Sequence, residues 1–106
     1  MRIKENNRDV DVEVYGIYWA EYQGKLQRFH FVIPYQGYEG LNAVPEVECE
    51  VTDAAISSQF RIVKNSRGND LIIHETLLED NLLDELIEHD PEAMKEFQRR
   101  LSKTIE

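Results

Sequence analysis

Hydrophobic and polar residues alternate with a period of two along residues 9–22, which predicts a β-strand. Gly16 lies where both faces of this strand become apolar, and it indicates a bulge or close packing there. The pair Gln23-Gly24 is typical of a tight turn, and alternation resumes along residues 25–34. We therefore expect an N-terminal hairpin of two antiparallel strands, preceded by a loose tail over residues 1–8.

Shorter strands follow this hairpin in the hydrophobic pattern. A polar cluster containing glycine at residues 65–70 predicts a turn between two of them. Residues 54–58 fit either a short helical turn or a loop. The pattern places the three further strands at residues 46–51, 59–64 and 71–73.

The strand expected at residues 46–51 has the most regular alternation. Its glutamates would lie on the outer face, while Val47, Cys49 and Val51 would face the core.

Helical periodicity replaces strand periodicity near residue 76. Leu78, Leu82 and Leu86 recur every four residues, as on the apolar face of an amphipathic helix. Asp90 and Pro91 suit the N-cap and the first position of a second helix. Two C-terminal helices are therefore expected.

Strands first and helices last predict an α+β fold. We expect an antiparallel sheet of about five strands, with the N-terminal hairpin first and the two C-terminal helices packed on one face. The pattern leaves open which face they cover. The 106 residues, 42% of them hydrophobic, suit one domain over residues 1–106 with a single core.

Targeting features are lacking in the sequence. Cys49 is the only cysteine, the first residues contain no apolar signal segment, and no stretch is long enough to span a membrane. These features lead us to expect a cytoplasmic protein that does not contact membranes.

Negative charge is concentrated in two parts of the chain. The net charge is −9, which disfavours direct binding to nucleic acid. Five carboxylates and no Lys or Arg lie between Phe31 and Phe60, and residues 75–92 hold eight more, again without Lys or Arg. Within the helix, Asp80/Asp84 and Asp84/Glu88 repel at i,i+4, which costs about 0.2–0.5 kcal/mol for each pair. A basic partner would supply the missing counter-charge, although such acids also keep a helix face soluble.

Catalytic motifs are missing as well. The sequence has no Gly-rich phosphate loop, no Cys-x-x-Cys pair and no His-Glu-x-x-His segment, so we expect no enzyme, no metal and no cofactor. Cys49 lies between glutamates, which disfavour a reactive thiolate. One alternative site is the sheet face with Arg28 and His30, where a glutamate such as Glu48 would complete a nuclease-like set.

Tyrosines are candidate anchors for a protein partner. Tyr35 and Tyr38 lie in a glycine-containing loop beside Glu39, whereas the tyrosines of the hairpin are shared between core and surface. Together, the small size, the acidity, this loop and the lack of catalytic motifs resemble bacterial immunity proteins of the contact-dependent inhibition type. These are cytoplasmic antidotes to nuclease toxins.

This resemblance implies that the chain binds a basic toxin domain and blocks its activity. The expected partner-binding residues are Tyr35, Tyr38, Glu39, Glu79, Asp80, Asp84, Glu85 and Glu88.

Three other functions remain open from the sequence. The chain could be a phage-type acidic inhibitor that mimics nucleic acid. It could be a small enzyme or ligand-binding domain that uses the Arg28 and His30 face. It could also be a regulatory subunit that forms homodimers through its aromatic hairpin.

Overall fold

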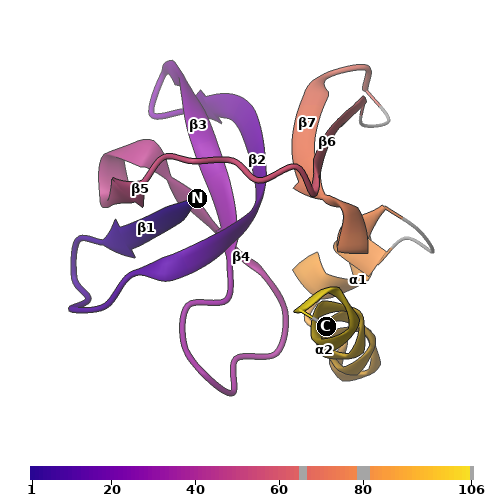
Figure 1. Cartoon of the computed structure of the whole chain (residues 1–106). Coiled ribbons are helices and arrows are strands. Elements are labelled where there is room, and N and C mark those ends of the chain that lie inside the picture. The colour runs from indigo at the N-terminus through magenta and orange to yellow at the C-terminus, as the bar shows by residue number, and fades with distance from the viewer. Residues whose placement is uncertain (65–66, 79–81, 106) are drawn as a thin grey trace.

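The computed structural model describes residues 1–64, 67–78 and 82–105 of the chain (Figure 1). It confirms the α+β class, with an antiparallel sheet followed by two C-terminal helices. The strands are β1 (Arg2–Glu5), β2 (Val12–Tyr22), β3 (Lys25–Val32), β4 (Asn42–Pro45), β5 (Cys49–Asp53), β6 (Phe60–Lys64) and β7 (Asp70–His74). The helices are α1 (Leu82–Ile87) and α2 (Pro91–Ile105), and the short 3₁₀ helices are η1 (Glu46–Glu48) and η2 (Glu75–Leu77).

The N-terminal hairpin of β2 and β3 forms as the sequence predicts. Gln23 and Gly24 both have positive φ angles, 53° and 79°, as in the type I′ turns that match the twist of a hairpin. The pairing register shifts between Val14 and Gly16, which confirms the expected irregularity. A Cβ atom on Gly16 would lie 2.9 Å from the ring of Phe31, so glycine also permits close packing there.

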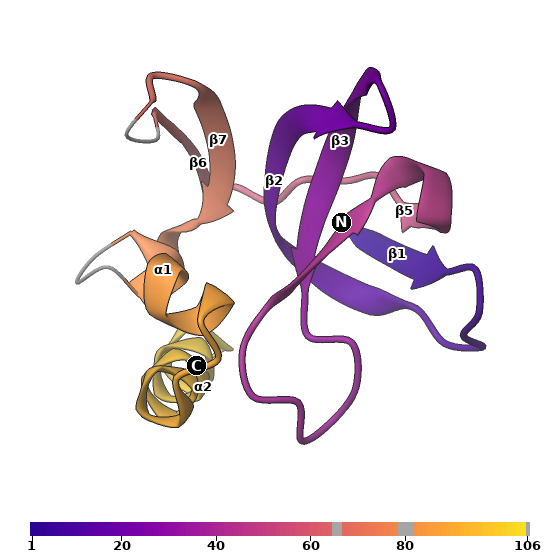
Figure 2. The same cartoon turned by 180° about the vertical axis from the view of Figure 1, so that it is seen from behind.

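The sheet curls so that five strands enclose one core. Its strand order is β4-β3-β2-β1-β5, and only η1 separates β4 from β5 along the chain (Figure 2). Hydrophobic side chains of the five strands therefore meet on one side of the sheet, with β5 contributing half-buried Cys49 and Val51. We call the buried set the barrel core: Ile3, Val14, Ile17, Val32 and Val44.

The expectation of a loose N-terminal tail is wrong for its first half. Strand β1 pairs with β2 on one side and with β5 on the other, and Ile3 is completely buried. A strand of four residues with one apolar side chain has no measurable periodicity, so the pattern gave no signal for it.

The strand expected at residues 46–51 is also shorter than its alternation suggested. Residues Glu46–Glu48 form η1, and β5 begins only at Cys49. Val47 is consequently 54% exposed and does not face the core. The chain must turn sharply between β4 and β5 to bring β5 beside β1, and this constraint overrides the local pattern.

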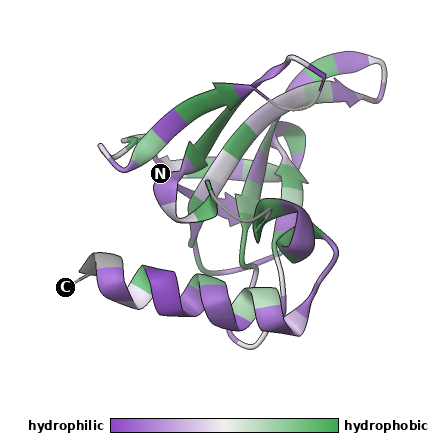
Figure 3. Ribbon diagram, turned by 90° about the vertical axis from the view of Figure 1, so that its right-hand side faces the viewer, coloured by the Kyte–Doolittle hydropathy of each residue, from purple (hydrophilic) through white to green (hydrophobic). Residues whose placement is uncertain are grey.

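The opposite face of the hairpin carries the second core. Strand β7 pairs with β2 and β6 pairs with β7, while α1 and α2 lie beside this part of the sheet (Figure 1). The helices therefore cover the face that presents Phe31, and Figure 3 shows hydrophobic and hydrophilic segments alternating along α2 beneath the sheet. This helix core consists of Phe31, Leu41, Leu71, Ile73, Leu77, Leu82, Leu86, Ala93, Met94 and Phe97.

Residues 54–58 form a loop that leads from β5 to β6, which settles the ambiguity of that segment. Leu78 precedes α1 and is exposed, so the apolar stripe of the first helix is shorter than its leucine spacing suggested. No helix of the described residues is long and apolar enough to cross a membrane.

Replacing Ile3 with alanine should lower the free energy of unfolding by about 2–4 kcal/mol, because it opens a cavity in the barrel core. Urea denaturation followed by the fluorescence of Trp19 measures this change. The control is Val10→Ala, since Val10 is exposed and its truncation should cost less than about 0.5 kcal/mol. An Ile3→Ala protein as stable as the control would contradict the structural role of β1.

Candidate functional site

The loop between β3 and β4 is fixed to the C-terminal end of α1. The backbone N–H of Leu41 donates to the carbonyl oxygen of Leu86 at 3.1 Å. The Tyr38 hydroxyl lies 3.1 Å from Nε2 of His89, and the two rings meet edge to face. Gly40 makes the approach possible, since a Cβ atom there would lie 2.5 Å from the Leu86 oxygen.

The end of α1 has its own hydrogen-bonded cap. The N–H of His89 donates to Leu86 O at 3.1 Å, and the N–H of Asp90 donates to Glu85 O at 3.0 Å, which is the Schellman pattern. His89 adopts a left-handed φ of 62°, a conformation that costs a non-glycine residue about 1–2 kcal/mol. Its ring is thereby directed to Tyr38, so the cap and the loop contact are made by the same residue.

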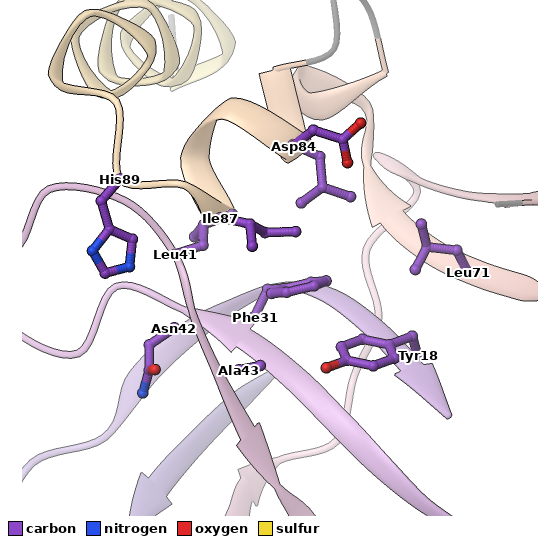
Figure 4. A pocket seen from close by; sticks show the side chains of 10 residues that line it. Tyr18, Phe31, Leu41, Asn42, Ala43, Leu71, Asp84, Ile87 and His89 are labelled. Atoms are coloured by element: carbon purple, nitrogen blue, oxygen red, sulfur yellow. The ribbon is translucent and has the colours of Figure 1, made fainter. Parts of the chain in front are cut away.

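A pocket of about 430 Å³ opens between α1 and the sheet, directly beside this junction (Figure 4). Figure 4 shows Phe31 and Tyr18 below the helix, with Asp84 at the end nearest β7 and His89 at the opposite end. The pocket is lined by Tyr18, Phe31, Leu41, Asn42, Ala43, Leu71, Leu83, Asp84, Ile87 and His89.

Three of the carboxylates expected to bind a partner lie close to this junction. Asp84 lines the pocket, Glu88 follows one turn later, and Glu39 lies in the attached loop; all three are exposed. Glu85 is half-buried and lines a separate hollow between α1 and α2. The structure therefore brings the loop and the helix together but directs Glu85 elsewhere.

None of these four carboxylates makes an ion pair within the described residues. Carboxylates elsewhere are often paired, and Glu96 is the clearest case. Arg99 and Arg100 donate hydrogen bonds to it, and they lower its pKa to about 2. The charge of the junction carboxylates is thus uncompensated, as is that of exposed Glu21, Glu50 and Asp53 elsewhere on the described surface. The expected contacts Glu79 and Asp80 lie outside the described residues.

The two loop tyrosines have different environments. Tyr38 is half-buried against His89, and burial raises the pKa of its hydroxyl. Tyr35 is 52% exposed, with its ring edge to face with Tyr38 at 5.3 Å and the guanidinium of Arg8 over it at 5.3 Å. Tyr35 is therefore the accessible anchor, while Tyr38 holds the loop in place.

Sequence reasoning missed most of the pocket. Tyr18 and Phe31 have the alternation of sheet residues, and Ile87 has the spacing of a helix stripe, so no pattern in the sequence distinguishes these three residues as a site. Ile87 is in fact 43% exposed. Periodicity identifies an apolar face but does not show whether another element covers it completely.

The alternative site on the sheet face has a different geometry from the one expected. His30 is fully buried, its Nδ1 donates to Val44 O at 3.1 Å, and its Nε2 accepts from Nε of Arg28 at 2.9 Å. Burial is the main cause that lowers the pKa of His30. Both ring nitrogens are engaged inside the protein, and Glu48 instead accepts a hydrogen bond from Tyr22. The three residues therefore do not form a shared catalytic face.

Cys49 and His74 also have structural contacts. Burial raises the pKa of the Cys49 thiol, whose sulfur lies 3.7 Å from Nδ1 of His30. His74 accepts the backbone N–H of Thr76 and so caps η2. In the described part of the chain, no three His, Cys, Asp or Glu side chains are grouped as metal ligands would be.

Comparisons with protein-family models, with curated protein sequences and with solved structures gave no match to this chain.

Replacing Gly40 with alanine should lower the free energy of unfolding by about 2–4 kcal/mol, because the new Cβ collides with Leu86 O at a φ of 123°. Urea denaturation measures the loss. Gly37→Ala is the matched control. Gly37 also has a positive φ, but no atom lies within 4 Å of the position of its Cβ, so the free energy of unfolding should fall by only about 1 kcal/mol. Equal losses in the free energy of unfolding at the two positions would show that the loop does not depend on its contact with α1.

The buried histidines should make the protein less stable in mild acid. Because the pKa values of His30 and His74 are lowered in the folded state, the unfolded chain takes up protons first below about pH 6.5. The free energy of unfolding should therefore fall between about pH 7 and about pH 5, by at most about 1.4 kcal/mol per pH unit for each histidine. Urea denaturation across this range measures how the free energy of unfolding changes with pH. His30→Gln should reduce this pH dependence, whatever the substitution itself does to stability. Stability that rises toward pH 5 would contradict this assignment.

Proposed function

We propose that this chain is a small, acidic, non-catalytic binding protein that neutralises a basic protein partner. Its best-supported role is that of an immunity protein that inhibits a cognate nuclease toxin in the cytoplasm. The observation that carries the proposal is the uncompensated charge of Glu39, Asp84 and Glu88 around the junction of loop and helix. We call this the junction surface.

Charge is the first support. The three carboxylates are exposed and make no ion pair within the described residues; some acids elsewhere, such as Asp11 and Glu46, are paired with arginine, while others, such as Glu21 and Glu50, are not. A surface of this kind complements a protein that grips nucleic acid, and the attraction accelerates association with that partner.

Preorganisation is the second support. The loop is held to α1 by the Leu41–Leu86 hydrogen bond, by the Tyr38–His89 contact and by the tight packing of Gly40. Binding would therefore cost little ordering entropy, which strengthens an interface for a given buried area.

Exposed apolar side chains are the third support. Tyr35 and Ile87 flank the carboxylates and keep about half of their surface accessible. Aromatic and aliphatic anchors surrounded by polar groups are the usual composition of a protein interface.

The charge reversal Asp84→Lys with Glu88→Lys should remove partner binding while the protein stays folded. The control is Glu21→Lys with Glu50→Lys, which gives the same net charge but alters exposed positions on β2 and β5. Wild type and both variants are immobilised, exposed to source-cell lysate at low ionic strength and eluted by salt steps. The wild type and the control should retain the same basic protein, and the junction variant should lose at least about tenfold in affinity.

The identity of the captured protein then tests the role. A nuclease whose activity disappears on addition of an equimolar amount of the chain would support the immunity function. A host enzyme of nucleic-acid metabolism would instead indicate a nucleic-acid mimic. Equal capture by all three proteins, or capture of nothing, would contradict the proposal.

A further inference from the structure

The pocket beside the junction has an aromatic floor and aliphatic walls. The rings of Tyr18 and Phe31 are stacked at 5.0 Å with 28° between their planes, and Figure 4 shows both below α1. Leu83 and Ile87 form the wall on the helix side, and Leu71 of β7 closes one end. At about 430 Å³ the pocket is large enough for one long side chain.

The polar groups of the pocket select the charge of its occupant. Among the described residues that line it, Asp84 is the one carboxylate, and none is a lysine or arginine. Within the described residues, Asp84 makes no ion pair, and the side chains of Tyr18 and Asn42 make no hydrogen bond. The net charge of −9 further disfavours an anionic occupant. The lining therefore suits a cation with an apolar stem.

Among such cations, a guanidinium group fits better than an ammonium group. A guanidinium is planar and weakly hydrated, so it stacks on aromatic rings, and its paired N–H donors match the two oxygens of a carboxylate. An ammonium group is compact and strongly hydrated, and it would lose more hydration against an apolar floor.

We propose that this pocket receives one arginine side chain of the basic partner. Its methylene stem lies along Leu83 and Ile87, and its guanidinium group binds Asp84 above the aromatic floor. This inference deepens the proposed function and rests on it, since it names the group by which the junction surface recognises a partner.

The test uses small probes and does not need the partner. Backbone amide signals of the isotopically labelled chain are recorded by NMR during titration with n-butylguanidinium. The comparison probe is n-butylurea, which has nearly the same shape without the charge. The guanidinium probe should shift the signals of pocket residues such as Phe31 and Leu83 with a dissociation constant on the order of millimolar. The urea probe should bind at least about fivefold more weakly.

Two matched variants separate a specific contact from general attraction. Asp84→Asn removes the carboxylate that lines the pocket, and Glu88→Gln removes an exposed carboxylate that does not line it. Asp84→Asn should weaken the binding of n-butylguanidinium about fivefold and leave that of n-butylurea unchanged. Glu88→Gln should change neither affinity by more than about twofold.

The inference is overturned if the two probes bind equally, if both variants have the same effect, or if the shifts spread over the acidic strands. Its failure is distinct from that of the proposed function. If a basic partner is captured but n-butylguanidinium does not bind specifically, the arginine pocket is disproved and the proposed function stands. If n-butylguanidinium binds specifically but no partner is captured, the proposed immunity function is disproved and the cation-binding pocket stands.

Discussion

The carbonyl oxygen of Leu86 is the point at which the loop between β3 and β4 is attached to α1. It accepts the N–H of His89, which closes α1, and the N–H of Leu41, which attaches the loop that precedes β4. A carbonyl oxygen has two lone pairs, so both bonds can form together. Gly40 is required beside it because any side chain would collide with that oxygen. The position of the loop relative to the helix, and thus of the pocket between them, depends on this contact.

The two cores explain why the binding features gather at this junction. The barrel core is enclosed by the curled strands, and the helix core fills the space between the opposite sheet face and α1 and α2. The short α1 helix covers only part of that face, so a pocket remains beside it, with half-buried Tyr18 and buried Phe31 in its lining (Figure 4). An apolar opening is thus formed where the exposed carboxylates of α1 and of the loop converge.

The elements that the sequence predicted are those determined by local interactions. The β2–β3 hairpin follows from two-residue alternation and the Gln23-Gly24 turn, and α2 follows from Asp90, Pro91 and a helical stripe. Strand β1 was missed because Ile3 is its only buried side chain, and its stability comes from pairing with distant β2 and β5. Among the candidate site residues, Tyr38, Glu39, Asp84 and Glu88 converge at one place, but the contact that unites them joins residues 51 positions apart. No local pattern records such a contact.

Amide hydrogen exchange of the chain, alone and with its captured partner, tests whether the junction surface is the interface. If the junction surface is the interface, the partner should slow exchange in residues 38–41 and 82–89 and leave β5 unchanged. Slower exchange confined to β5 or to β6, with α1 unaffected, would show that the partner binds elsewhere.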